Sequence, residues 1–571
     1  MKMINKAALT ISGLAMLSSS VFAQSLADAK KAIDAEQYQK AESMLKNLTQ
    51  TQATKDENFF YLGWVYLKTN EPDSAKATFT KGISVNPKSA LNYAGLGAVD
   101  RLDKNATSAK ADLDKAVAAI DKKDLEPYVY IGKAYLLEPN PDANAAIAVL
   151  KKGIASNPKE KNPELFAALG DAYRSQLKNT DAYDNYQQAL AINPKMVSAI
   201  VATGVIWKQA NNFEDSEKEY RKALAIDPNY GPAYRELAET YLRWGNNTKK
   251  ADAPTKYTQA VDFYKKYLDL TDRSVASRMR YADFLVYAQD YKGLEQEAND
   301  IAKIAPKDNL KVYRYLGYAA YENKNYQAGL DALNKFMSQA DQKRIIPLDY
   351  LYLGRLQLAI GGQDSAAINN LRKALQLDTT QVDAYGEIAK TLYNQKKYVE
   401  AGDTYKTYIA KSRQVTLGDY LREGVSYYNA FKEQYFSTAK TKPVPDTTLL
   451  VKADSAFSYI QHHAAAPQAT VALYQARAND LKEPSRNTTN GYAKPYYEQY
   501  IQLINAKTPV ADADKVYLGE AYAYLGTYYE YKEKDAAKAS ENFTKAREND
   551  PTNKQAIAYF SKKGGGSAKG K

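Results

Sequence analysis

The chain repeats one pattern of small and large residues every 34 residues, and this period constrains the fold more than any other feature. From Gly170, the offsets +3, +12, +16, +19 and +24 give Tyr173, Ala182, Tyr186, Ala189 and Pro194. The same offsets from Gly63 and from Gly204 again give an aromatic, a small, an aromatic and a small residue, and then proline. A fixed period of this length is typical of repeat proteins, in which each unit packs against its neighbours.

The spacing predicts a helical hairpin for each unit. The stretch LFAALGDAYRSQ has apolar residues at the i, i+3, i+4 and i+7 positions of a first helix, and polar breakers such as KNTD or NNFED follow. A second helix, such as SEKEYRKALAI, then returns. The small residues at the reference position and at +12 allow the two backbones to approach closely, and the residue at +16 fills the space between neighbouring hairpins. The proline at +24 ends the second helix.

These motifs resemble the tetratricopeptide repeat family. LGDAY, LGWVY and LGTYY match the first half of the family pattern, and SAKATFTKG, DAYDNYQQA and KASENFTKA match the second half. The resemblance implies an all-α fold, a right-handed superhelical solenoid of about fourteen helix-turn-helix repeats; the alternative is an unrelated helical array such as HEAT repeats. The reference residues are Ala29, Gly63, Gly97, Gly132, Gly170, Gly204, Ala238, Ala282, Gly317, Gly354, Ala389, Gly424, Ala476 and Gly526.

Breaks in the pattern divide the chain. Three insertions rich in Pro, Asn, Thr and Lys are expected to be loops between the two helices of their units, and their role stays open: 244–258, 432–450 and 481–495. The predicted segments after the N-terminal leader are a regular repeat array over 24–410, irregular repeats with long loops over 411–505, a terminal repeat with a capping helix over 506–561, and a disordered Gly/Lys tail over 562–571.

The N-terminus has the layout of a secretory signal peptide over residues 1–23. Lys2 and Lys6 precede an apolar stretch, and the small-residue end at Ala23 predicts cleavage after that residue. No other segment approaches the ~18 apolar residues of a transmembrane helix. The chain has no Cys, so a lipidated cysteine and disulfides are excluded. We therefore expect a periplasmic or secreted protein without a membrane span; peripheral association with a membrane complex stays open.

The sequence shows no arrangement typical of catalysis. There is no GxSxG, HExxH or phosphate-binding glycine loop, and the two histidines, His462 and His463, are adjacent rather than at the i, i+4 spacing of metal ligands. We therefore predict no enzyme activity, no cofactor and no metal, and a structural role for the histidines. The formal charge of +12 gives weak support for nucleic-acid binding, and the predicted export argues against it.

The resemblance also implies that the first helices line a concave groove that binds partners. Residues at −6, −3, +1, +4 and +5 from the reference position are expected to face it, and Arg and Tyr are enriched in binding hot spots. The alternative is that these are solvated surface residues. The predicted partner-binding residues are Arg174, Lys208, Arg235, Arg243, Arg314, Tyr318, Tyr321, Arg355, Lys390 and Tyr393. Acidic residues intrude at Asp171, Glu239, Asp283 and Glu322, so the groove is mixed with a basic bias.

Our hypothesis is a non-enzymatic interaction scaffold whose groove binds an extended peptide or helix of a cell-envelope protein. The alternative is a binder of anionic cell-surface polysaccharide that uses the basic groove and tail. Polyanion binding should weaken steeply with ionic strength, whereas binding through Tyr and aliphatic contacts should weaken less. The sequence leaves the identity of the partner and the oligomeric state open.

Overall fold

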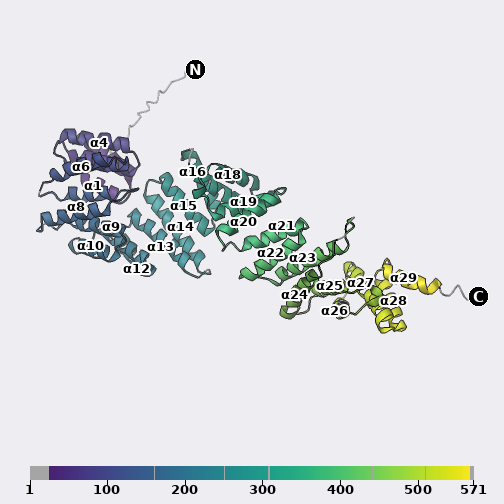
Figure 1. Cartoon of the computed structure of the whole chain (residues 1–571). Coiled ribbons are helices and arrows are strands. Elements are labelled where there is room, and N and C mark those ends of the chain that lie inside the picture. Colours follow the sequence, from purple (N-terminus) through teal and green to yellow (C-terminus); the bar gives the residue numbers. More distant parts are fainter. Residues whose placement is uncertain are drawn as a thin grey trace, which may run out of the picture. The chain divides into compact units, whose positions relative to one another are not determined.

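The computed structural model describes residues 25–565 except 122, 160, 250, 307–308, 440, 442 and 508. Within these residues the structure is all-helical: helices α1 to α28 pair in chain order as fourteen hairpins, and α29 follows them (Figure 1). The predicted fold class and repeat number are confirmed. The predicted signal peptide, 1–23, lies outside the described residues.

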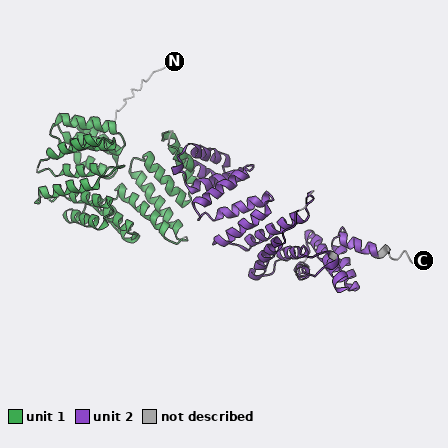
Figure 2. Ribbon diagram, viewed as in Figure 1, with its two compact units in different colours: residues 1–315 green, residues 316–571 purple. Residues whose placement is uncertain are grey.

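The chain divides into two compact units, residues 1–315 and 316–571, and the boundary falls inside α17 (Lys311–Glu322) (Figure 2). The other helices of the first unit are α1 (Leu26–Asp34), α2 (Tyr38–Thr51), α3 (Asp56–Lys68), α4 (Pro72–Val85), α5 (Ala90–Leu102), α6 (Ala106–Ala118), α7 (Glu126–Tyr135), α8 (Ala143–Ser156), α9 (Pro163–Ser175), α10 (Asn179–Ile192), α11 (Val197–Gln209), α12 (Phe213–Ile226), α13 (Gly231–Asn247), α14 (Ala253–Leu270), α15 (Val275–Ala288) and α16 (Tyr291–Ile304). Those of the second unit are α18 (Tyr326–Gln339), α19 (Pro347–Ile360), α20 (Asp364–Leu377), α21 (Asp383–Asn394), α22 (Tyr398–Lys411), α23 (Leu417–Tyr435), α24 (Thr448–His463), α25 (Ala469–Asp480), α26 (Lys494–Asn505), α27 (Asp512–Tyr528), α28 (Ala536–Asn549) and α29 (Lys554–Gly565), with short turns η1 (Gln342–Arg344), η2 (Arg486–Thr488) and η3 (Tyr529–Glu533).

The reference glycines are required because an aromatic ring of the second helix occupies the space of a side chain. A Cβ atom on Gly170 would lie 2.5 Å from the ring of Tyr186, and one on Gly204 would lie 2.5 Å from the ring of Tyr220. Both tyrosines, at offset +16, are fully buried, as the repeat pattern predicts. The small residue thus sets how closely the two helices of a hairpin pack.

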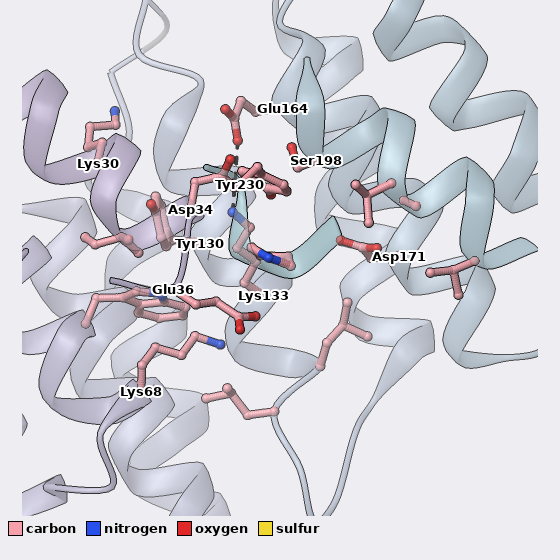
Figure 3. Close-up of a pocket in the computed structure, with 18 of the residues that line it drawn as sticks. Lys30, Asp34, Glu36, Lys68, Tyr130, Lys133, Glu164, Asp171, Ser198 and Tyr230 are labelled. Atoms are coloured by element: carbon pink, nitrogen blue, oxygen red, sulfur yellow. Dashed lines mark ion pairs between the residues drawn. The ribbon is translucent and has the colours of Figure 1, made fainter. Parts of the chain in front are cut away.

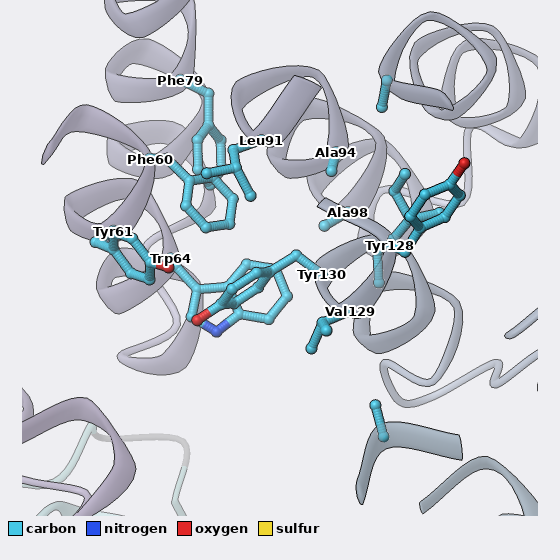
Figure 4. Close-up of a cluster of buried hydrophobic side chains, with 14 of the residues drawn as sticks. Phe60, Tyr61, Trp64, Phe79, Leu91, Ala94, Ala98, Tyr128, Val129 and Tyr130 are labelled. Atoms are coloured by element: carbon cyan, nitrogen blue, oxygen red, sulfur yellow. The ribbon is translucent and has the colours of Figure 1, made fainter. Parts of the chain in front are cut away.

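An aromatic cluster forms the core at the start of the first unit (Figure 4). The ring centroid of Phe60 lies 5.8 Å from that of Trp64 and 4.7 Å from that of Tyr130. Trp64 and Tyr130 meet edge to face, with centroids 4.9 Å apart and an interplanar angle of 81°. Because Trp64 is on α3 and Tyr130 is on α7, this contact joins the second and fourth hairpins directly.

The loop predicted over 244–258 is largely helical, which corrects that expectation. Helix α13 continues to Asn247 and α14 begins at Ala253. Trp244 stacks on Phe213 with centroids 5.6 Å apart, and the ammonium of Lys256 lies 3.3 Å from the centre of the Trp244 ring. These contacts give the Trp244 ring of α13 one partner on α12 and one on α14, so the helices extend into the segment that composition assigns to a loop.

The other two insertions are connections shorter than predicted. Helices α23 and α24 leave residues 436–447 between them, and α25 and α26 leave 481–493, which includes the short turn η2. The predicted tail, 562–571, begins inside α29, because that helix runs to Gly565; residues 566–571 lie outside the described part.

Candidate binding cavities

The first hairpin of unit 1 packs against the seventh, so seven hairpins enclose their common inner side. Nη1 of Arg235 on α13 donates to Glu36 at 2.5 Å, and the hydroxyl of Tyr267 on α14 donates to the same carboxylate at 2.8 Å. The backbone N–H of Gln39 donates to Asp272 at 2.8 Å. Ala35 is buried in the hydrophobic core that α11 to α14 form. These hydrogen bonds join residues 199 to 233 positions apart in the chain.

A cavity of about 850 Å³ lies on this inner side, and its walls come mainly from first helices: α1, α3, α7, α9, α11 and α13 (Figure 3). Most lining residues sit at the offsets that the repeat pattern predicts. Lys133 is at +1 from Gly132, Arg174 is at +4 from Gly170, and Arg235 is at −3 from Ala238. The inner face therefore follows the repeat register.

Ion pairs satisfy much of the charge in this cavity. Lys30 lies 2.5 Å from Glu126, and Arg174 lies 3.1 Å from Asp171. Arg235 lies 2.5 Å from Glu36. Arg174 and Arg235, two of the predicted partner-binding residues, thus line the cavity but already hold carboxylates of this chain.

Two lining groups are less well compensated. The pKa of the Lys68 ammonium is lowered, chiefly because the cavity walls remove it from bulk water and also because Lys133 is close. The pKa of Asp34 is raised to about 6, chiefly by the same loss of water; Lys133 opposes this rise and Glu164 adds to it. Both pKa values are shifted towards the uncharged form, because the loss of water at each group outweighs the attraction of the opposite charges around it.

The raised pKa of Asp34 predicts a pH-dependent stability. As pH rises from about 4 to above 6, the unfolded chain ionises this group before the folded chain does, so the free energy of unfolding falls over that range. Because Asn mimics the uncharged carboxyl, Asp34→Asn is expected to raise Tm relative to the natural protein at pH 8 and to have less effect at pH 5. Thermal melts at both pH values test this. An equal difference in Tm at pH 5 and pH 8 would contradict the assigned shift.

A second cavity, of about 480 Å³, lies in unit 2 on the inner side of α17, α19 and α21. Three of the predicted residues line it, one from each helix: Tyr321, Arg355 and Lys390. The guanidinium of Arg355 contacts Glu387 through two nitrogens, at 3.0 Å from Nε and 2.7 Å from Nη2. Lys390 is exposed at the rim. We call this cavity, with its lining residues Tyr321, Arg355, Glu387 and Lys390, the unit 2 groove.

Two predicted residues are buried, which corrects the expectation that they face an open groove. Tyr318 is 1% exposed; its hydroxyl donates to Asp349 at 2.6 Å and its ring stacks on Tyr352 with centroids 4.3 Å apart. Arg314 is 8% exposed. The offset +1 leads to the interior at Tyr318 because Tyr352 of the following hairpin stacks on its ring.

The remaining predicted residues lie outside both cavities. Nζ of Lys208 lies 2.5 Å from Glu236, and Nε of the exposed Arg243 donates to Asn211 at 2.9 Å. The hydroxyl of Tyr393 accepts a hydrogen bond from Asn429 at 2.9 Å. Glu236 lines the unit 1 cavity and also contacts Arg235 at 3.3 Å, so Lys208 adjoins that cavity through this carboxylate. The role of all three residues in partner binding stays a prediction.

Sequence reasoning missed Asp34, Lys68 and Lys133. The signal was present, because Asp34 and Lys68 both sit at +5 from their reference residues, Ala29 and Gly63, and Lys133 sits at +1. The prediction used the offsets only in the central repeats. The same rule applied to the first four repeats finds all three.

Neither histidine lines the two cavities described above, and both are exposed at the end of α24. Each ring lies within hydrogen-bond distance of a backbone oxygen one turn earlier, and His463 stacks on Tyr459 with centroids 3.9 Å apart. Within the described residues, no group of three or more His, Cys, Asp or Glu side chains could hold a metal ion. In the same residues, no helix has the length and apolar character needed to cross a membrane.

Two segments of the chain match family models described as tetratricopeptide repeat: residues 58–89 and 167–231. The chain therefore contains tetratricopeptide repeats, a fold that typically serves as a protein–protein interaction scaffold and is typically non-catalytic.

The curated relatives match over limited segments. Anaphase-promoting complex subunit 3 of Schizosaccharomyces pombe is 22% identical over 180 residues, which are 27% of this chain and 27% of that protein. The probable UDP-N-acetylglucosamine–peptide N-acetylglucosaminyltransferase SPINDLY of Hordeum vulgare is 27% identical over 110 residues, 19% of this chain and 12% of that protein. The matches thus span about a quarter or less of these relatives.

Two solved bacterial structures are also similar. The C-terminal part of a TPR repeat-containing protein from Cytophaga hutchinsonii shares 27% identity with a TM-score of 0.35, over 49% of this chain and 98% of that one. A tetratricopeptide repeat protein from Parabacteroides merdae shares 17% identity with a TM-score of 0.31, over 47% of this chain and 98% of that one. Because both TM-scores are below 0.5, the fold assignment rests on the helices and the repeat matches.

Proposed function

We propose that the protein is a non-enzymatic interaction scaffold of the cell envelope, exported to the periplasm or beyond, and that its unit 2 groove holds an extended peptide or helix of a protein partner. The supporting observation is that three successive first helices, α17, α19 and α21, place Tyr321, Arg355 and Lys390 around one concavity. Concave surfaces of stacked repeats are the usual binding surfaces of solenoid proteins.

The side chains of the groove favour a polypeptide over a polyanion. Tyr321 is half-buried and packs edge to face on Tyr352, with centroids 5.5 Å apart, so its ring is held in place before a partner arrives. Glu387 and Asp364 add carboxylates to the lining. These negative charges repel an anionic polysaccharide, whereas a peptide with mixed side chains can pair with both signs of charge.

Tyr321→Ala is expected to weaken capture of the partner by ~2 kcal/mol, about 30-fold, because a preorganised tyrosine in a concave site is a typical hot spot. Lys390→Glu is expected to weaken capture of the partner too, with a stronger effect at low salt than at high salt.

The measurement is a crosslinking pull-down with the natural protein as bait in envelope extract from its own source. Lys373→Glu is the matched control, because it makes the same charge change on α20, the second helix of the neighbouring hairpin. Equal capture by Tyr321→Ala, Lys390→Glu and the natural protein would contradict the groove assignment.

A further inference from the structure

The ammonium groups of Lys68 and Lys133 both lie in the unit 1 cavity. Each is close to one ring of the Trp64–Tyr130 pair. The ammonium of Lys68 lies 5.8 Å from the centre of the Trp64 ring, and the ammonium of Lys133 lies 4.9 Å from the centre of the Tyr130 ring. Lys133 has Glu164 at 4.0 Å, whereas no carboxylate in the described part of the chain forms an ion pair with Lys68. An anion at Lys68 would supply the missing counter-charge.

Asp34 is an acidic residue that lines the same cavity as Lys68. It is the last residue of α1, where the negative end of the helix dipole disfavours a carboxylate. It makes no ion pair with another described residue; the ammonium of Lys133 and the hydroxyl of Tyr230 stabilise its charge, but they do not offset the loss of water. A cation at Asp34 would relieve both the loss of water and the repulsion from the helix end and Glu164.

The two groups occupy equivalent places in adjacent hairpins. Each sits at +5 from its reference residue, Asp34 on α1 and Lys68 on α3, and both are exposed to the same cavity (Figure 3). Packed helices lie roughly 8–10 Å apart, so a ligand that pairs with a residue on α1 and a residue on α3 must bridge about one helix spacing. At ~3.3–3.6 Å for each extended residue, two or three residues span this distance.

We propose that the unit 1 cavity binds a short zwitterionic peptide of two or three residues, whose free carboxylate is held by Lys68 and whose free ammonium is held by Asp34. The cavity volume of about 850 Å³ falls within the ~300–1,000 Å³ of ligand pockets and leaves room for side chains. Leu136, Leu137 and Val205 line the same cavity and would contact apolar side chains of the peptide. This inference concerns a different unit from the partner groove and does not rest on the proposed function.

The test is calorimetric titration of the purified full-length protein with trialanine. N-acetyl-trialanine lacks the ammonium and trialanine amide lacks the carboxylate, so each reports on one end of the site. Each blocked peptide is expected to bind at least about tenfold more weakly than trialanine, the effect of a lost hydrogen-bonded charge pair of ~1.4 kcal/mol or more. Alanine, whose two charges are too close together to reach both groups, is expected to bind more weakly than dialanine or trialanine.

Variants assign the two ends of the peptide. Asp34→Asn is expected to bind trialanine and its N-acetyl form equally, while it still prefers the free carboxylate over the amide. Lys68→Met is expected to bind trialanine and its amide equally, while it still prefers the free amine. Lys81→Met, an exposed lysine on α4 outside the cavity, is the matched control and should behave like the natural protein.

Two results would overturn the proposal. One is that the natural protein binds none of these peptides at millimolar concentration. The other is that Asp34→Asn and Lys68→Met, with Tm values showing that they are folded, discriminate between free and blocked ends as the natural protein does. Loss of binding in the Tyr321→Ala pull-down would leave this result untouched, so failure of one proposal is distinguishable from failure of the other.

Discussion

Tyr186→Ala is expected to lower the free energy of unfolding by ~3–5 kcal/mol, the range for removing a large buried aromatic side chain. The ring is fully buried and occupies the space above Gly170. Its hydroxyl donates to Asp171 at 2.8 Å and accepts from Nε of Arg174 at 3.1 Å, so the substitution also removes a partner from two charged groups. Because each repeat is held by its neighbours, the fifth hairpin should lose its packing first.

Tyr186→Phe is the matched control, because it keeps the ring and removes only the hydroxyl. It is expected to cost ~1–2 kcal/mol, mainly from the hydrogen bonds to Asp171 and Arg174. Urea unfolding followed by circular dichroism measures both variants. Equal losses for the Ala and Phe variants would show that the ring does not provide the packing that the repeat pattern assigns to offset +16.

Arg235→Glu is expected to destabilise the contact between the first and seventh hairpins by ~2–4 kcal/mol. Arg235 lies 2.5 Å from Glu36 and 3.3 Å from Glu236, so the substitution would bring three carboxylates together in a partly buried place. Breaking a buried ion pair typically costs ~3–5 kcal/mol, and partial exposure to solvent reduces that figure. The cost should appear as faster hydrogen exchange in α1 and α2, because these helices would separate from α13 and α14.

Arg243→Glu makes the same change on the same helix, α13, at an exposed position. It is expected to change the free energy of unfolding by no more than about 0.5 kcal/mol. Hydrogen exchange followed by mass spectrometry compares the two variants. Unchanged exchange of α1 and α2 in Arg235→Glu would contradict the closure of unit 1.

The repeat register could be read from the sequence because each hairpin has its own local constraint. A small residue at the reference position and a large one at +16 must match for two helices to pack, as Gly170 and Tyr186 do. The pattern therefore located the fourteen hairpins of the described residues, and its offsets place part of the predicted set on the cavity walls. The cavity residues Arg174 and Arg355 follow directly from those offsets.

The closure of unit 1 could not be predicted in the same way. Glu36 and Arg235 are far apart in the chain, and whether they meet depends on the accumulated rotation of seven hairpins, to which each hairpin adds a small angle. The burial of Tyr318 is a similar case. It shares the offset +1 with Lys133, but Tyr352 of the following hairpin stacks on its ring and covers it. Side chains of neighbouring repeats decide which inward positions stay open.

The most direct test of the scaffold function places a photoreactive benzoylphenylalanine at position 321 in the unit 2 groove, or at the control position 373 on α20, and irradiates each protein in envelope extract from its own source. The account predicts a discrete crosslinked protein at position 321 that is absent at position 373 and is lost when Lys390→Glu is combined with the probe. The same crosslinks at both positions, or a crosslink at 321 that Lys390→Glu leaves unchanged, would contradict the claim that this groove holds the partner.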